Sequence, residues 1–385
     1  MKNDLPTEAS AQPPEDFTGL TTETPSTAAG GIPSVVSAVK HAFGAMGVAR
    51  SLVTLNRMNQ KGGFDCMSCA WPDPDGERSH LAEYCENGAK AVSDEATTKK
   101  ITPEFFAAHS VAELSQQSDF WLNQQGRLTH PMVLRKGATH YEPITWDAAF
   151  ALVAREFTAL ASPNEAIFYT SGRTSNEAAF LYQLLIRQFG TNNLPDCSNM
   201  CHESSGSALG QTLGIGKGTV TLEDIHTTEL VIIAGQNPGT NHPRMLSALE
   251  RTKANGGRII AVNPLIEAGL KAFRNPQTVR GVLRGGVELA DEYCQIRLNG
   301  DLAFFQGLNK LLLEADALDH AFIAEHTSGF DEFAAFVEPY TLESVAEQTH
   351  LSVEAIQRLV TTYSVQGAAV HDARLASVMI ANGIS

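Results

Sequence analysis

One stretch of this 385-residue sequence constrains the fold more than any other: two apolar runs flank a helix-length segment between residues 229 and 264. The first run is Leu230–Ile233 and the second is Ile259–Val262. A helix that begins near Pro243 and stops at Gly256 fits between them. This order and spacing predict a βαβ unit, in which a right-handed crossover joins two parallel strands. The expected fold class is therefore α/β, with a parallel, Rossmann-like sheet.

Both expected strands end in loops that contain Asn-Pro, and the first loop has the sequence GQNPGTNHP. In open α/β sheets, ligands lie beyond the carboxyl ends of the strands. Glycines in such loops let backbone amides approach a phosphate closely. The two loops therefore predict a binding rim, and ordinary loop residues without a ligand remain the alternative. The rim comprises Gly235, Gln236, Asn237, Thr240, Asn263 and Pro264.

Residues 145 to 190 indicate a helix, a strand and a second helix. Thr145 can cap a helix whose apolar side chains recur at spacings of four and three, which predicts one stripe packed on a core. A short strand is expected at 166–169. Thr174 and Glu177 form a capping box for the second helix, and Gly190 is its expected stop. The apolar positions are Trp146, Phe150, Val153, Phe157 and Leu160 in the first helix and Leu181, Leu184 and Leu185 in the second.

Three of the six cysteines lie close together in the first quarter of the chain. Cys66 and Cys69 form a C-x-x-C pair, and Cys85 follows. This spacing lets thiolates converge on one metal ion or cluster. On spacing alone, zinc explains the pattern as well as an iron–sulfur cluster does. Three cysteines are one short of a complete set, and the candidates for the fourth ligand are His80, Asp65, Asp73 and a water molecule.

A second cysteine group has the sequence DCSNMCHESSG. Cys201 and His202 are adjacent, with Cys197 just before them. A thiolate beside an imidazole can combine a soft metal ligand with a proton acceptor. The alternative is a buried cysteine next to a surface histidine. Cys294, in a strand-like stretch, is expected to be a small buried hydrophobic residue.

The charge balance excludes one class of partner. The chain has 28 Lys and Arg against 43 Asp and Glu, a formal net charge of −15, so most of its surface would repel a phosphate backbone. Nucleic acid is not expected as a partner. The sequence has no apolar run of about 18 residues and no signal-peptide pattern, so neither a membrane nor secretion is expected, and the predicted location is the cytoplasm. The expected ligand is a small-molecule substrate.

Five sequence blocks, in order, carry a resemblance to a known family. They are FDCMSCAWPDP, YCENGAKAV, FYTSGRTSNEAAFLYQLLIRQFGTNNLPDCSNMCHESSG, GQNPGTNHPRM and AVNPLIEAG. Together they resemble the FdhF/YdeP branch of the molybdopterin oxidoreductases, the formate dehydrogenase alpha subunits, over residues 40 to 360. The resemblance implies an incomplete version of domains 1–3 of the formate dehydrogenase and DMSO reductase architecture, with an irregular iron–sulfur-type segment before the α/β domains.

Composition and resemblance together divide the chain into five parts. Residues 1–34 have few apolar anchors and are expected to be a disordered arm. The iron–sulfur-type segment covers 35–130, and 131–200 is the first half of an α/β domain. The pterin-dinucleotide-binding α/β domain covers 201–340. Residues 341–385 are expected to begin a returning helical segment that is cut short.

The resemblance also implies cofactors and roles. It implies two molybdopterin guanine dinucleotides that hold one molybdenum, a 4Fe-4S cluster, two-electron oxidation of formate or a similar small oxo-acid, and an electron-acceptor protein as partner. Cys66, Cys69 and Cys85 match cluster ligands, Cys201 matches the molybdenum ligand, and His202 matches the neighbouring proton acceptor. The residues that match pterin-dinucleotide contacts are Gly235, Asn237, Asn241, His242, Asn263, Pro264 and Asp301.

Three departures from the family pattern accompany the resemblance. Relatives have a third cysteine soon after the C-x-x-C, and this chain has none between Ala70 and Pro74. Relatives have a lysine where this chain has Asn87, and Lys90 is the nearest basic residue. The family chain is about twice as long, so a truncated and poorly active form is expected. The alternatives are a zinc-stabilised nucleotide-binding module without catalysis and a vestigial fragment without cofactor.

Overall fold

A computed structural model describes residues 24–69, 71–76, 78–79, 82–170, 174–195, 197–283, 285–366 and 380–381, with side chains described outside 197–202, 280, 360–366 and 380–381. These residues form two compact units. Beyond the first 25 residues, the first unit comprises Val36–Ser68 and His80–Leu194. The second unit comprises Ser26–Val35, Cys69–Ser79 and Pro195–Ser385.

The second unit is built on a parallel sheet with the strand order β10-β7-β6-β11. Its strands are β6 (Leu230–Ala234), β7 (Arg258–Val262), β10 (Glu292–Cys294) and β11 (Ile380–Ala381). The central pair is in register from Leu230 opposite Arg258 to Ala234 opposite Val262. The predicted βαβ unit is confirmed, with α13 (Pro243–Ala254) as the crossover helix.

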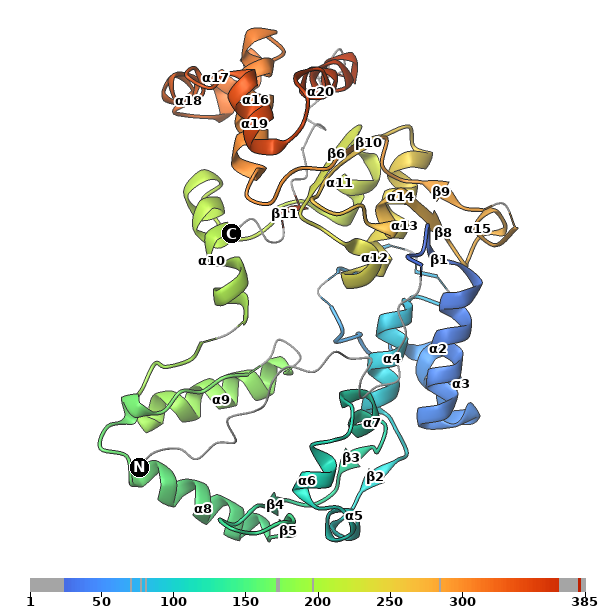
Figure 1. Ribbon diagram of the computed structural model, residues 1–385, viewed down its shortest axis with the longest axis vertical. Coiled ribbons are helices and arrows are strands. Elements are labelled where there is room, and N and C mark those ends of the chain that lie inside the picture. Colours follow the sequence, from blue (N-terminus) through green and yellow to red (C-terminus); the bar gives the residue numbers. More distant parts are fainter. Residues whose placement is uncertain are drawn as a thin grey trace. The chain divides into compact units, whose positions relative to one another are not determined.

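Helices cover both faces of this sheet (Figure 1). Successive strand residues point to opposite faces, so Val231 and Ile233 pack with α13 while Leu230 and Ile232 pack with α16 (Asp301–Glu314). Burial on both faces explains why β6 and β7 are continuous apolar runs rather than alternating ones.

The remaining elements of the second unit surround the sheet. A smaller sheet has the order β1-β8-β9, with a parallel and an antiparallel pair. These strands are β1 (Ala29–Gly30), β8 (Ala272–Arg274) and β9 (Val287–Glu288). The other helices are α10 (Cys197–Thr212), α11 (Leu222–Thr227), α12 (Pro238–Asn241), α14 (Ala268–Lys271), α15 (Val279–Leu283), α17 (His320–His326), α18 (Phe330–Val337), α19 (Leu342–Thr349) and α20 (Val353–Gln366).

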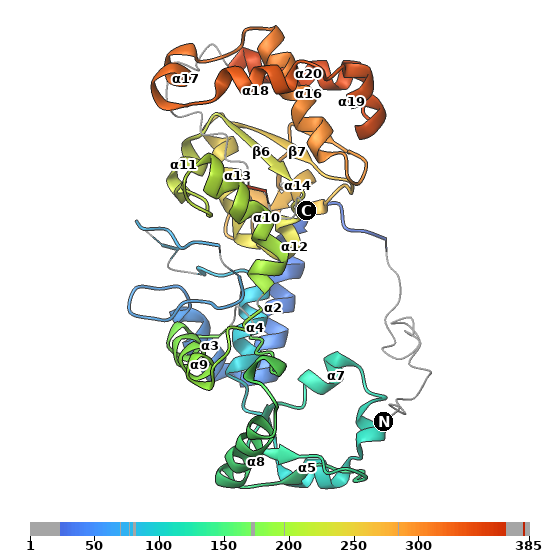
Figure 2. The same cartoon turned by 90° about the vertical axis from the view of Figure 1, so that its left-hand side faces the viewer.

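The first unit has a small helical core. It is formed by α2 (Gly31–Met46), which starts in the second unit, α3 (Val48–Arg57) and α4 (Glu86–Glu95). Figure 2 shows α2 and α4 side by side, and buried Ala42 and Ala89 belong to the shared core. Residues 29–34, which the composition placed in the arm, form β1 and the start of α2.

Short elements continue the first unit after α4. They are β2 (Lys100–Ile101), α5 (Pro103–Ala108), α6 (Val111–Leu114), α7 (Asp119–Asn123), β3 (Arg127–Leu128), β4 (Met132–Val133), β5 (Glu142–Pro143), α8 (Trp146–Thr158), the 3₁₀ helix η1 (Pro163–Glu165) and α9 (Asn176–Phe189). Strand pairing here is limited to β2 with β3 and β4 with β5, among the residues that the structure describes.

The predicted ends of α8 and α9 are partly confirmed. Thr145 Oγ1 accepts a hydrogen bond from the Ala148 N–H at 3.2 Å, as expected of a cap. Gly190 ends α9 in the left-handed region, with φ at 105°. The capping box at Thr174 is wrong, because Ser175 caps α9. The strand predicted at 166–169 is also wrong, since these residues lie in no sheet. A strand needs a neighbour to complete its backbone hydrogen bonds.

The apolar stripes of α8 and α9 are not packed on a core as predicted. Trp146 is 65% exposed and Phe150 is 64% exposed. Leu181, Leu184 and Leu185 are exposed as well, and Ile186 is the buried residue of α9. The end of α8 packs against other segments: the Phe157 ring lies 5.4 Å from that of Phe168 and 5.0 Å from that of Phe189. The prediction failed because no sheet face in the described part of this unit covers the stripes.

No single helix in the described ranges is long and apolar enough to cross a membrane. The bent pair α2 and α3 meets the length and composition criteria only when the two helices are joined, and they are bent by 120°.

Candidate functional site

The two Asn-Pro loops meet at the carboxyl edge of the main sheet. The Gly235 N–H donates to the Val262 carbonyl at 2.9 Å, which continues the ladder one residue beyond β6. Asn263 then donates its side-chain N–H to the Gln236 carbonyl at 2.9 Å. Gly235 has φ at 66°, a left-handed conformation that favours glycine. The structure therefore brings together the rim that the sequence predicted.

Asn237 connects the first loop to the segment after β7. Its side-chain oxygen accepts from the Thr240 N–H at 3.2 Å and so caps α12. Its Nδ2 donates to Glu267 Oε2 at 2.7 Å. The Glu267 N–H in turn donates to the Tyr293 hydroxyl at 3.0 Å. Glu267 and Tyr293 were not predicted, and the one signal in the sequence was an acidic residue within an otherwise apolar loop.

Gln236 has an unpaired polar atom at the centre of this rim. The residue is 3% exposed, and its buried Nε2 has no hydrogen-bond partner among the residues that the structure describes. A buried N–H without an acceptor costs about 1–3 kcal/mol. Such atoms are rare, and this one lies next to the carboxyl ends of parallel strands, where open α/β sheets bind their ligands.

Two glycines let the loops after β6 and β7 cross in close contact. A Cβ at Gly269 would lie 2.8 Å from the Gly239 Cα, and one at Gly239 would lie 3.1 Å from the Gly269 Cα. Both glycines belong to short helices, α12 and α14, that touch at this point. A side chain at either position would separate the two halves of the rim.

The other predicted pterin contacts are placed around the same loops. His242 precedes α13 and is half-buried, and burial lowers the pKa of its imidazole below the ordinary value of 6.5. The last residue of α12, Asn241, is exposed. Pro264 is half-buried, and its carbonyl accepts from Gln295 Nε2 at 2.9 Å. Asp301 is the first residue of α16, after the loop that leaves β10.

Two of the three predicted cluster cysteines converge in the first unit. A Cβ placed on Gly88 would lie 3.0 Å from Cys66 Sγ and 3.7 Å from Cys85 Sγ, so both thiols reach the same glycine. Cys85 caps α4, and its Sγ accepts from the Gly88 N–H at 3.4 Å. The amino end of a helix attracts negative charge, which complements a thiolate ligand.

Asn59 holds the two cysteine segments together, and the sequence did not predict it. It is 2% exposed and adopts a left-handed φ of 56°. Its Oδ1 accepts from the Cys66 N–H at 2.7 Å, and its Nδ2 donates to the Glu83 carbonyl at 2.6 Å. Asparagine tolerates this conformation better than most residues, which is the local signal that sequence reasoning could have used.

The remaining cysteine predictions have different outcomes. Cys69 is half-buried and starts the segment that belongs to the second unit. No group of three or more metal-ligating side chains occurs among the residues whose positions are described. Cys201 and His202 belong to α10, but their side chains lie outside the described residues. Cys294 is buried as predicted, and burial raises the pKa of its thiol to about 12.

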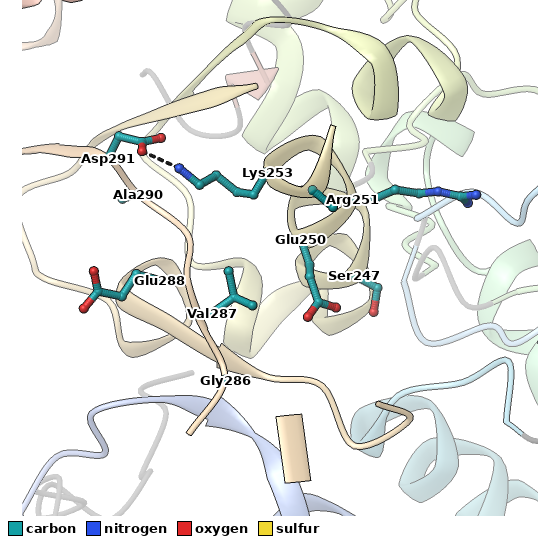
Figure 3. Close-up of a pocket in the computed structure, with 10 residues that line it drawn as sticks. Ser247, Glu250, Arg251, Lys253, Gly286, Val287, Glu288, Ala290 and Asp291 are labelled. Atoms are coloured by element: carbon teal, nitrogen blue, oxygen red, sulfur yellow. Dashed lines mark hydrogen bonds and ion pairs between the residues drawn. The ribbon is translucent and has the colours of Figure 1, made fainter. Parts of the chain in front are cut away.

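A hollow of about 900 Å³ lies elsewhere on the second unit (Figure 3). Lys253 and Asp291 pair across it, and Asp291 also accepts from the Ile259 N–H at 2.8 Å, near the start of β7. The hollow is therefore at the amino ends of the strands. Ligands of open α/β sheets bind at the other end, so this hollow is not the candidate site.

Comparison with known proteins identifies the family of this chain. Residues 127–323 match the family model described as Molybdopterin oxidoreductase. The chain belongs to this family, and the predicted family resemblance is confirmed.

The chain is also similar to individual proteins. The chain is 56% identical to an uncharacterized oxidoreductase of Mycobacterium tuberculosis, over 86% of this chain and 43% of the relative. It is 42% identical to Protein YdeP of Escherichia coli, over 87% of this chain and 45% of that protein. Formate dehydrogenase H of Escherichia coli is 30% identical over 62% of this chain and 32% of that enzyme. The chain thus spans less than half the length of these relatives.

Two features test whether the described residues fit the cofactors that the family implies. A pterin dinucleotide fits the rim, because Gln236 Nε2 has no acceptor within the described part of the chain and Gly235 is exposed beside it. For an iron–sulfur cluster, Cys66 and Cys85 fit as a thiol pair around Gly88, while a complete ligand set is not grouped within the described first unit.

We predict that Gly269→Ala destabilises the second unit by about 1–3 kcal/mol, because its methyl group would overlap the Gly239 backbone. Chemical denaturation monitored by tryptophan fluorescence measures the change. Gly218→Ala is the matched control, since a Cβ there meets nothing within 4 Å. Equal stability of the two variants would contradict the close contact.

The lowered pKa of His242 gives a second prediction. Between pH 6.5 and the lower folded-state pKa, the unfolded chain binds more protons than the folded one, so stability falls as the pH falls through this window. His242→Gln should remove this part of the pH dependence. Unfolding free energies of both proteins at pH 5 to 8 test the expectation, and parallel curves would refute it.

Proposed function

We propose that this chain supplies a cluster-ligand segment and most of one pterin-dinucleotide site to a molybdenum oxidoreductase of the formate dehydrogenase type. The observation that carries the proposal is the rim at the carboxyl ends of β6 and β7, where the buried Gln236 Nε2 has no acceptor among the described residues. Membership in the molybdopterin oxidoreductase family supports the same conclusion. The substrate class is formate or another small oxo-acid, and an electron-acceptor protein is the partner.

The rim residues bind and orient the cofactor. The backbone at Gly235 has no side chain and leaves room for a phosphate, although its N–H already donates to the Val262 carbonyl. Gln236 Nε2 donates to an acceptor atom of the pterin dinucleotide. Asn237 and Asn263 act mainly by fixing the loops, since their side chains are hydrogen-bonded to Glu267 and to the Gln236 carbonyl. His242, kept neutral by its lowered pKa, can donate or accept a hydrogen bond without adding charge. Asn241, Pro264 and Asp301 are proposed as further contacts.

The cysteines and His202 are proposed to serve the redox chemistry. When bound, molybdenum held by two molybdopterin guanine dinucleotides would supply two-electron redox chemistry, and a 4Fe-4S cluster would supply a route for the electrons. In this chain, Cys201 is the proposed molybdenum ligand and the His202 imidazole the proposed proton acceptor. Cys66, Cys69 and Cys85 are the proposed cluster ligands, of which Cys66 and Cys85 already meet at Gly88.

Metal analysis with EPR of the anaerobically purified protein tests the proposal. We expect molybdenum and about four irons per chain. Zinc alone would support a nucleotide-binding module without catalysis, and a chain without metal would support a vestigial fragment. Cys201→Ala is expected to lose the molybdenum signal and keep the iron signal. An unchanged molybdenum signal in that variant would remove Cys201 from the metal site.

Removal of the Gln236 side-chain N–H is expected to have opposite effects on the stability of the chain and on pterin binding. Gln236→Met keeps the volume and removes the buried donor, so it should stabilise the cofactor-free chain by about 1 kcal/mol. The same change should lower the pterin retained after purification, because the cofactor loses a hydrogen bond. Denaturation of the cofactor-free chain and pterin quantification by fluorescence measure the two effects. A loss of stability together with full pterin retention would contradict a ligand role.

A further inference from the structure

The segment after Cys69 belongs to the second unit, although its described residues, 71–76 and 78–79, form no helix or strand. Trp71 packs against two apolar clusters of this unit, one under α13 and one between α11 and α13. An aromatic side chain of this size contributes a large part of the apolar contact of a short segment. The position of this segment is therefore set by its contacts with the rest of the second unit.

Asp73 adds an ionic connection two residues later. Its Oδ1 accepts from Arg244 Nη1 at 2.5 Å, and its Oδ2 accepts from Arg78 Nη1 at 3.3 Å. The Asp73 and Arg244 side chains are 16% and 15% exposed, so water and salt screen their attraction only weakly. Both carboxylate oxygens therefore have a guanidinium partner.

Arg244 places this connection next to the candidate site. It is the second residue of α13, directly after His242 and Pro243 of the GQNPGTNHP loop. The Asp73–Arg244 pair therefore joins the stretch that begins at Cys69 to the loop that forms the pterin rim.

We propose that Asp73 and Arg244 are positioning residues that fix the Cys69 segment on the pterin-binding unit, and that Asp73 is not the missing ligand of the cluster. A metal would have to displace two guanidinium groups to reach this carboxylate. The part of the proposal that concerns the cluster rests on the proposed function, whereas the ionic connection itself does not.

Alkylation of the metal-free 385-residue chain tests the connection without any cofactor. Under anaerobic conditions, the rate at which N-ethylmaleimide labels Cys69 is followed by peptide mass spectrometry. Asp73→Asn and Arg244→Met should each raise this rate by about tenfold, because charged hydrogen bonds hold local openings closed to that extent. Arg244→Lys, which keeps the charge and loses the planar fork, should give an intermediate rate.

Two controls keep the outcome interpretable. Lys253→Met removes a different ion pair from the same helix, that with Asp291, and should leave Cys69 labelling unchanged. Cys294 is buried and should stay unlabelled in every folded variant. If Arg244→Met unfolds the unit and exposes Cys294, the comparison moves to Arg244→Lys. If the variant at position 244 that remains folded shows an unchanged rate of Cys69 labelling, the proposal is overturned.

Reconstitution with iron and sulfide separates the positioning role from a ligand role. We expect Asp73→Asn, Asp73→Cys and Arg244→Met to lower the bound iron alike and to alter the EPR spectrum of the reduced cluster in the same way. A cluster that is lost in Asp73→Asn but intact in Asp73→Cys and Arg244→Met would identify a ligand and overturn the proposal. If the unmodified chain forms no cluster, the proposed function fails, and the labelling rates still decide the positioning role.

Discussion

The in-register pairing of β6 with β7 is the constraint on which the candidate site depends. The ladder ends at Ala234 opposite Val262, so both strands leave the sheet at the same level. Their loops then continue the contact through the Gly235 N–H and the Asn263 side chain. A shift of one residue would turn every strand side chain to the opposite face and separate these loops. The apolar runs that build the core thus also determine where the polar rim lies.

Sequence alone predicted the parts of this chain in which local pattern and tertiary environment agree. The apolar runs at 230–233 and 259–262 predicted the two central strands, which the structure extends by one residue each to Ala234 and Arg258. Thr145 and Gly190 act through neighbouring backbone atoms. The strand expected at 166–169 failed because its formation depends on a partner strand. The glutamate at 267 and the asparagine at 59 were missed because their roles depend on hydrogen bonds across the fold.

The cysteines also show which features local sequence predicts and which features the tertiary fold decides. The spacing of Cys66 and Cys69 suggested that they act together, yet the chain continues from Cys69 into the segment fastened by Trp71 and Asp73. Cys66 instead meets Cys85, which lies farther along the sequence, because both approach the small surface of Gly88. Sequence spacing indicates which thiols are able to meet, whereas the packing of α2, α3 and α4 decides that Cys66 and Cys85 lie beside the same glycine.

The hydrogen bonds of Asn59 have a consequence for how a metal group would be acquired. Many small metal-binding segments are unordered until the metal arrives, and the binding free energy is then reduced by the entropy of ordering the chain. Here the Cys66 and Cys85 segments are already joined through one buried amide and a helical core. The entropy of bringing these two segments together is therefore lost during folding of the chain itself, so this ordering does not depend on a metal.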